Sequence, residues 1–180
     1  IYTGHTRIYQ QVDTIDPIIS SVSPADDATA VARESNIVLN FSEAVDVESG
    51  NIVIYKSSND EVVETIAIIS SQVEGTGSTQ ITINPSKNFE ALSEYYVKID
   101  SNAFDDSFGN SFAGINDKTT LNFKTGSHIF ETKTSLQTAV NAWINDPDTA
   151  TETYGDINTW DVSQIKDFSE LFRNQTTFNS

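Results

Sequence analysis

Between residues 16 and 126, short segments alternate apolar with polar residues, and this period of two restricts the fold more than any other feature. Ile37, Leu39 and Phe41, for example, share one face of such a segment. Successive side chains of a β-strand point to opposite faces, so the pattern predicts strands with one buried face. About seven strands are expected, at residues 18–22, 36–41, 51–55, 62–69, 80–83, 95–99 and 121–123.

Turn-forming residues lie between the predicted strands, at residues 23–27, 48–51, 75–78 and 108–110. No segment of helical periodicity separates the strands, which disfavours a parallel α/β fold. Short strands at this spacing predict a mainly β fold, an immunoglobulin-like antiparallel β-sandwich. Residues 75–77 (GTG) belong to a hairpin, because a phosphate loop would need a lysine and a following helix.

After Gly126 the apolar spacing becomes helical. Residues 134–145 are predicted to form an amphipathic helix that begins at Thr134 or Ser135 and ends at Asp146-Pro147. A second helix is predicted over residues 163–173, with four apolar residues on one face: Ile165, Phe168, Leu171 and Phe172. The sandwich is therefore expected to be followed by a small helical segment.

This pattern divides the chain into three parts. Residues 1–15 are interpreted as a linker or the end of a preceding extracellular repeat, residues 16–126 as the sandwich, and residues 127–180 as the helical segment. The first residues lack a methionine, a basic region and an apolar stretch, so we interpret the chain as the middle of a longer polypeptide.

The charge restricts the partners. The chain has 26 acidic residues against 10 basic ones, a net charge of −16. Such a surface repels nucleic acid and anionic lipid, because each phosphate contact needs Lys or Arg. No apolar run reaches the roughly 18 residues of a transmembrane helix. We therefore predict neither nucleic-acid binding nor direct membrane insertion. The absence of cysteine also excludes disulfides, thiolate metal sites and cysteine nucleophiles.

Acidic side chains and one amide gather in loops after predicted strands: Glu43, Asp46, Asp105, Asp106 and Asn110. Two interpretations stay open. Asp, Asn and Gly are good turn formers, and carboxylate and carbonyl oxygens are also the ligands that Ca²⁺ prefers. The spacing does not match an EF-hand. The sequence requires no cofactor, and Ca²⁺ is the one ion for which it offers a ligand set.

No catalytic residue is predicted. His5 and His128 are far apart in the sequence and lie near linkers, without a nucleophile motif. Tyr55 and Tyr96 are expected to lie outward on strands, where their rings either stack on a sugar or pack and hydrogen-bond across the sandwich.

Two sequons, at Asn40 and Asn174, mark candidate glycosylation sites. Only a eukaryotic secreted host would necessarily use them.

Three stretches follow one another in the order of a known domain: residues 17–26 (PIISSVSPAD), 37–45 (IVLNFSEAV) and 95–100 (YYVKID). They resemble the bacterial Ig-like domain of surface-layer and adhesin type, and residues 103–114 and 120–126 resemble its penultimate loop and closing strand. The resemblance implies a tandem structural module of surface layers, adhesins and large secreted proteins. Some relatives lie beside enzymes as spacers.

The end of the chain carries a second pattern, in residues 154–163 (YGDINTWDVS), 168–172 (FSELF) and 178–179 (FN). It is similar to the BspA-like leucine-rich surface-protein repeat, a unit of about 25 residues that recurs many times. One repeat cannot bury its own apolar face, since solenoids need about three or more. Residues 127–180 are thus expected to hold a capping helix and an incomplete first repeat.

Together these features predict a non-enzymatic structural or adhesive module of a secreted or cell-surface protein or extracellular filament. Its expected partners are neighbouring domains or copies of the same protein. The alternatives are a module that binds a glycan or a cell-surface protein, and a spacer in an extracellular hydrolase. The first would be favoured by exposed aromatic residues clustered at one end of the strands, and the second by a catalytic domain elsewhere in the full-length protein.

Overall fold

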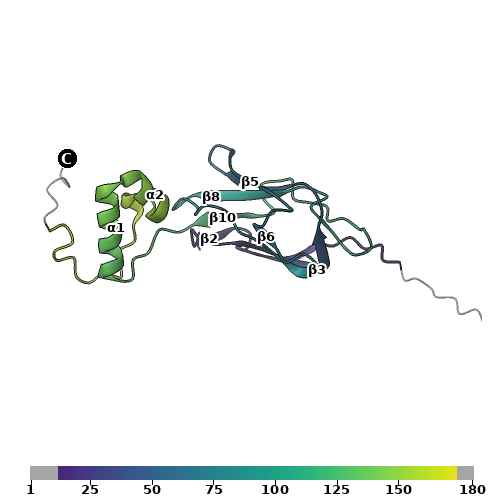
Figure 1. Ribbon diagram of the computed structural model, residues 1–180, viewed down its shortest axis with the longest axis horizontal. Helices are drawn as coiled ribbons and strands as arrows, with labels where there is room; N and C mark the ends of the chain where they lie inside the picture. The colour runs from purple at the N-terminus through teal and green to yellow at the C-terminus, as the bar shows by residue number, and fades with distance from the viewer. Residues whose placement is uncertain (1–11, 174–180) are drawn as a thin grey trace, which may run out of the picture.

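A computed structural model describes residues 12–173, in which ten strands form two sheets that face each other (Figure 1). The first sheet has the order β1 (Ile19–Ser23), β3 (Ile37–Val47), β7 (Ser78–Ile83), β6 (Val73–Glu74), with β9 (Phe104–Asp105) paired to β3. The second has the order β2 (Ala28–Val31), β10 (Asn122–Thr125), β8 (Glu94–Ile99), β4 (Asn51–Lys56), β5 (Glu61–Ala67). The predicted mainly β, immunoglobulin-like sandwich is confirmed.

Each of the seven predicted strands is present, and three further strands are β2, β6 and β9. These three have only four, two and two residues, too few to show an alternation in the sequence. All strand pairs are antiparallel except β2 and β10, which run parallel. β3 is longer than expected and reaches Val47, so that Glu43 and Asp46 lie within a strand and not in a loop.

The core lies between the two sheets and consists of the predicted inward residues. Ile37 and Leu39 of β3 are fully buried, as are Ile52 and Ile54 of the facing β4. Aromatic rings extend this core in two groups: Phe41 with Phe104 and Phe112, and Phe89 with Tyr95 and Phe123. The alternation in the sequence therefore reports directly on which face of each strand is buried.

A separate helical segment follows the sandwich. Its α1 (Lys133–Asn145) confirms the predicted helix but begins two residues before Ser135, with Thr132 as the N-cap of a capping box. Asp146 ends α1 and at the same time caps α2 (Pro147–Tyr154), where its side chain accepts the Thr149 N–H. A short 3₁₀ helix, η1 (Ile157–Thr159), comes next. The segment has its own small core: Phe130, Leu136, Ala139, Val140, Ile165 and Leu171.

The predicted end of the first helix at Asp146-Pro147 is confirmed, because α1 ends at Asn145 with Asp146 as its C-cap. Pro147 then occupies the first turn of α2, a helix that the sequence did not predict and in which the missing N–H of proline costs nothing. The helix predicted over residues 163–173 is wrong, since this stretch forms turns. The carboxylates of Asp161 and Asp167 accept the N–H groups two residues ahead, and Glu170 has a left-handed φ of 61°. Such local bonds compete with a helix.

The two parts lie end to end. Figure 1 shows α1 and α2 beyond one end of the sheets, while the stretch that begins at residue 12 lies at the opposite end. Residue 12 and the helical segment therefore lie at opposite ends of the sandwich.

The core packing can be tested with a matched pair of phenylalanines. Phe104 is fully buried, 5.2 Å from the Phe41 ring centroid, whereas Phe108 is 54% exposed. We expect Phe104→Ala to lower the free energy of unfolding by about 3–5 kcal/mol and Phe108→Ala to change it by less than about 0.5 kcal/mol. Urea denaturation, followed by far-UV circular dichroism, measures the free energy of unfolding of each variant. Equal effects of the two substitutions would contradict the assigned core.

Candidate functional site

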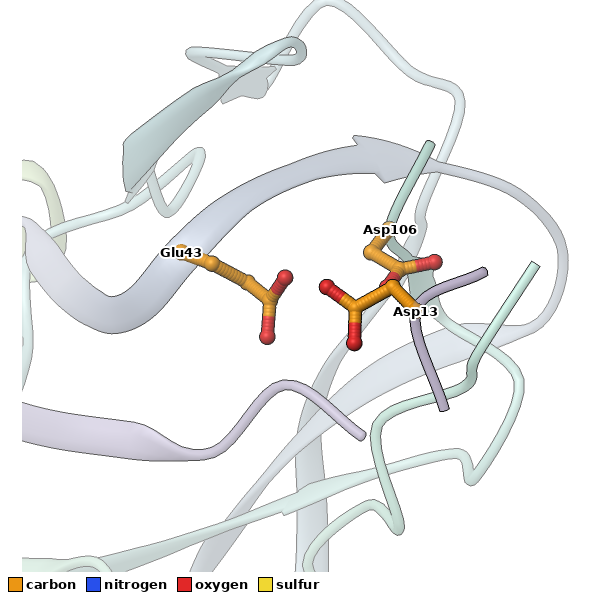
Figure 2. A group of neighbouring side chains, drawn as sticks. All are labelled: Asp13, Glu43 and Asp106. Carbon is orange, nitrogen blue, oxygen red and sulfur yellow. The ribbon is translucent and has the colours of Figure 1, made fainter. Parts of the chain in front are cut away.

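Three carboxylates converge at the end of the sandwich where the described chain begins. Asp13 precedes β1, Glu43 belongs to β3, and Asp106 follows β9. One carboxylate oxygen from each lies within 4.8 Å of the others, and Figure 2 shows the three side chains pointing toward a common point. We call this group the acidic cluster.

The strand pairing explains why Glu43 and Asp106 meet. β9 pairs antiparallel with the last residues of β3, so that Val47 faces Phe104 and Asp46 faces Asp105. Consecutive side chains of a strand point to opposite faces. Asp106 therefore lies on the same side as the buried Phe104, whereas Asp46 and Asp105 are turned to the other side.

Asp106 is held firmly in its ionised form. Its Oδ1 accepts the N–H groups of Phe108 and Asn110, both at 2.8 Å, and its Oδ2 accepts the Asn110 side-chain amide at 2.7 Å. Burial to 6% exposure opposes ionisation, but these hydrogen bonds outweigh it and keep the pKa of Asp106 below its ordinary value. The cluster thus contains a fixed, buried negative charge.

The ionised form of Glu43 is disfavoured in the acidic cluster. Burial first, and then the charges of Asp13 and Asp106, raise the pKa of the Glu43 carboxyl above its ordinary value. A raised carboxyl pKa means that the folded state gains stability as the pH falls and loses it as the pH rises through that pKa. A cation between the three groups would remove the same repulsion at neutral pH, and oxygen ligands of this kind suit Ca²⁺.

The structure brings together part of the predicted calcium ligand set. Glu43 and Asp106 lie in the acidic cluster, and Asn110 touches it by donating its amide to Asp106. Asp46 and Asp105 form a separate pair, in which Asp46 accepts the Thr76 hydroxyl at 3.1 Å. Calcium binding itself stays a prediction.

Sequence reasoning missed Asp13. This residue lies in the part of the chain assigned to a linker, so no strand pattern connected it with the loops after β3 and β9. The one indication in the sequence was the position of Asp13 shortly before the first predicted strand, which places it near one end of the sandwich.

The other predicted sites lie elsewhere. Asn40 is half-buried on β3, where its side chain donates to Ser21 at 3.0 Å and accepts from Gln80 at 2.9 Å. The second sequon, at Asn174, lies outside the described residues, as does His5. Glycosylation stays a prediction for both asparagines.

The two tyrosines do not form an open sugar-binding face. Tyr55 and Tyr96 stack with centroids 4.8 Å apart, but Tyr96 is only 2% exposed. Its hydroxyl donates to Asp60 at 3.2 Å, and the Lys118 ammonium lies 5.3 Å from the centre of its ring. Of the two alternatives for Tyr96, the structure therefore favours packing with a hydrogen bond, because the Tyr55 ring and the Asp60–Lys118 ion pair lie against its ring.

Fold and site together define an immunoglobulin-like β-sandwich with an acidic cluster at one end and a helical segment at the other. The chain belongs to the bacterial Ig-like domain family, whose sequence pattern matches residues 13–125. No curated protein matches the chain. Within residues 12–173, no helix has the length and apolar character needed to cross a membrane.

Several solved structures are similar in part. CopC from Methylosinus trichosporium OB3b is 14% identical, with 62% of this chain and 95% of CopC covered and a TM-score of 0.42. The N-terminal part of the bacterial S-layer protein SbsC is 16% identical over 63% of this chain, with a TM-score of 0.43. The match spans 24% of that SbsC chain and 14% of the longer rSbsC(31-844). Likenesses of this size carry no information about ligand or partner.

Calcium should stabilise the sandwich if the acidic cluster binds it. At about ten times the dissociation constant, a ligand adds roughly 1.4 kcal/mol, which corresponds to a rise in Tm of about 3–6 °C for a chain of this size. We expect this rise in millimolar Ca²⁺, no comparable rise in equal Mg²⁺, and reversal by chelation, all measured by differential scanning calorimetry.

Two substitutions locate the effect. Glu43→Gln should abolish the calcium response, whereas Glu48→Gln, at an exposed acid just beyond the end of the same strand, should preserve it. An unchanged Tm in calcium, or an equal response of both variants, would remove the metal interpretation and leave the turn-forming one.

Proposed function

We propose that this chain is a non-enzymatic structural or adhesive module of a secreted or cell-surface protein, in which the sandwich supports the start of a solenoid. Its domain division is residues 1–15, 16–126 and 127–180, as the sequence predicts. The proposal depends on one observation in the helical segment, the parallel pairing of two short stretches that lie far apart in the sequence.

These stretches pair around Ile129 and Asp161. The Phe130 N–H donates to the Asp161 carbonyl at 2.9 Å, and the Asp161 N–H donates to the His128 carbonyl at 2.8 Å. The result is a parallel bridge between Ile129 and Asp161. Parallel pairing of consecutive units along one face is how a solenoid stacks its repeats, so this bridge supports the BspA-like interpretation of residues 154–179.

The other edge of this ladder is open. The Trp160 carbonyl and the Val162 N–H point away from Ile129, and neither has a hydrogen-bond partner within residues 12–173. Apolar side chains of the same segment are also partly exposed: Ile129 is 56% exposed and Phe168 49%. An open parallel edge suits the addition of a further repeat, which would pair with residues 160–162, and the exposed apolar side chains of the segment offer surface for it to bury.

Family membership supports the structural role of the sandwich and an extracellular or cell-surface location. The net charge of −16 disfavours nucleic acid and anionic lipid as partners and leaves other proteins. No specific observation favours either alternative function, the module that binds a glycan or a cell-surface protein or the spacer in a hydrolase. The buried Tyr96 takes away the aromatic surface that a glycan would need. A spacer within a hydrolase would use the same sandwich for the same mechanical purpose.

The open edge can be tested by adding a second copy of residues 156–180 to the C-terminus. If the edge accepts a repeat, burial of roughly 100 Å² of apolar surface contributes about 2.5 kcal/mol. Amide exchange in residues 157–173, followed by mass spectrometry, should then slow at least about tenfold. Exchange in β3 should not change, because β3 lies in the sandwich.

A scrambled copy of the same composition is the matched control. It should leave exchange in residues 157–173 as in the original chain. Equal protection by the scrambled copy, or no protection by the true one, would contradict the proposed solenoid start.

A further inference from the structure

A single buried cation lies where the sandwich meets the helical segment. Arg33 follows β2 and is only 4% exposed. Its Nε donates to the Phe89 carbonyl of the sandwich at 2.8 Å, while Nη1 and Nη2 donate to the Thr153 and Glu152 carbonyls of α2 at 3.0 and 3.3 Å. Within residues 12–173 no carboxylate forms an ion pair with this guanidinium.

These bonds make the burial of Arg33 conditional on α2. The last carbonyls of a helix have no partner within the helix, and the negative end of the helix dipole attracts a cation there. A buried charge is costly unless hydrogen bonds satisfy it. Arg33 is therefore both buried and bonded through Nη1 and Nη2 only while the last turn of α2 is docked on the sandwich.

Close approach of the backbone completes the contact. Gly155 ends α2 with a φ of +80°, and a Cβ at this position would lie 3.2 Å from the Cβ of Ala91 and 3.5 Å from the guanidinium carbon of Arg33. A Cβ here would be tighter than ordinary packing against Ala91, and the left-handed φ strains any residue other than glycine at the end of α2. The glycine thus lets the helix end touch the sandwich.

His128 lies at the same junction, in the connection between β10 and α1. Its half-buried ring is 4.5 Å from the Phe130 ring and 5.4 Å from that of Tyr154, the last residue of α2. His128 and Arg33 line one cavity of about 510 Å³. The other charged side chains of this cavity are Glu34, Lys124 and Asp161, two acids and one further cation.

We propose that Arg33 and His128 form an acid-sensitive clamp, which holds α2 on the sandwich while His128 is neutral and releases it when His128 is protonated. The inference goes beyond the proposed function, because the clamp would act whether or not further repeats follow. At neutral pH it makes the sandwich and the helical segment one stiff body. In mild acid a second cation appears beside the buried guanidinium, and the helical segment can swing about residues 126–128.

The direction of the pH effect follows from the surroundings of His128. Burial and the charge of Arg33 lower the pKa of His128 below its ordinary value of 6.5, against the opposing influence of Glu34. The docked state therefore binds the proton less readily than the released state. The contribution of His128 to docking is complete above about pH 6.5 and is lost as the pH falls below that value.

The test measures the distance between the two parts in the full chain. The chain contains no cysteine, so spin labels can be attached to Ser58→Cys in the β4–β5 turn and Asn141→Cys in α1, both at exposed positions. Double electron–electron resonance should give one narrow distance at pH 7.5 and a broad distribution at pH 5. Circular dichroism of the sandwich should not change between these two pH values.

Four variants in this labelled background separate the clamp from other effects of acid. His128→Phe keeps an aromatic ring but has no proton to gain, and should give the narrow distance at both pH values. Arg33→Met should give the broad distribution at both, with the released fraction at pH 7.5 increased about tenfold or more. Gly155→Ala should do the same from the helix side without altering any residue of the sandwich. Lys87→Met removes an exposed cation near the same end and should behave as the original chain.

Two results would overturn the clamp: a distance distribution in the original chain that is the same at pH 7.5 and pH 5, or a narrow distance in both Arg33→Met and Gly155→Ala. Broadening of His128→Phe in acid would overturn the role of His128. None of these measurements involves the open edge at residues 160–162, so failure of the clamp and failure of the solenoid proposal remain distinguishable.

Discussion

The packing of β3 against the facing sheet is the interaction on which the rest of the structure depends. β3 pairs with β1, β7 and β9, and its buried residues Ile37 and Leu39 lie between the two sheets. Because it continues to Val47, the same strand also carries Glu43 and provides the edge on which β9 pairs. The core and the acidic cluster are therefore consequences of one long strand, with the core fixing the position at which the carboxylates meet.

Sequence patterns predict this sandwich well because a strand with one buried face alternates apolar with polar residues. Longer strands such as β3 and β7 display that period, whereas β9, with two residues, cannot. The error over residues 163–173 has a different origin. Apolar spacing there is helical, and Ile165 and Leu171 are buried, but side-chain hydrogen bonds from Asp161 and Asp167 fix turns in place of a helix. Only two of the four residues predicted on one helical face are buried, because without a helix Phe168 and Phe172 do not share the face of Ile165 and Leu171.

The candidate site was partly predictable for the same reason. Glu43 and Asp106 stood out as acids next to strand ends, but whether two strand ends meet depends on pairing across the sheet, and Asp13 reaches the cluster from outside any strand. Arg33 and His128 gave no signal, since a lone cation before a strand and a lone histidine in a linker are common. Arg33 contacts residues that lie 56 to 120 positions away in the sequence. Contacts between residues so far apart in the sequence leave no local pattern.

The two ends of the sandwich respond to protons in opposite directions. At the acidic cluster, repulsion raises the pKa of Glu43, so acid favours the folded arrangement there. At the helical end, burial and Arg33 lower the pKa of His128, so acid opposes docking. A single measurement of stability against pH would mix these two effects. The pairing of Ile129 with Asp161 lies within the helical segment, which contacts the sandwich through Arg33. If this segment starts a solenoid, as we propose, loss of the Arg33 contacts would uncover one side of it while leaving the sandwich core intact.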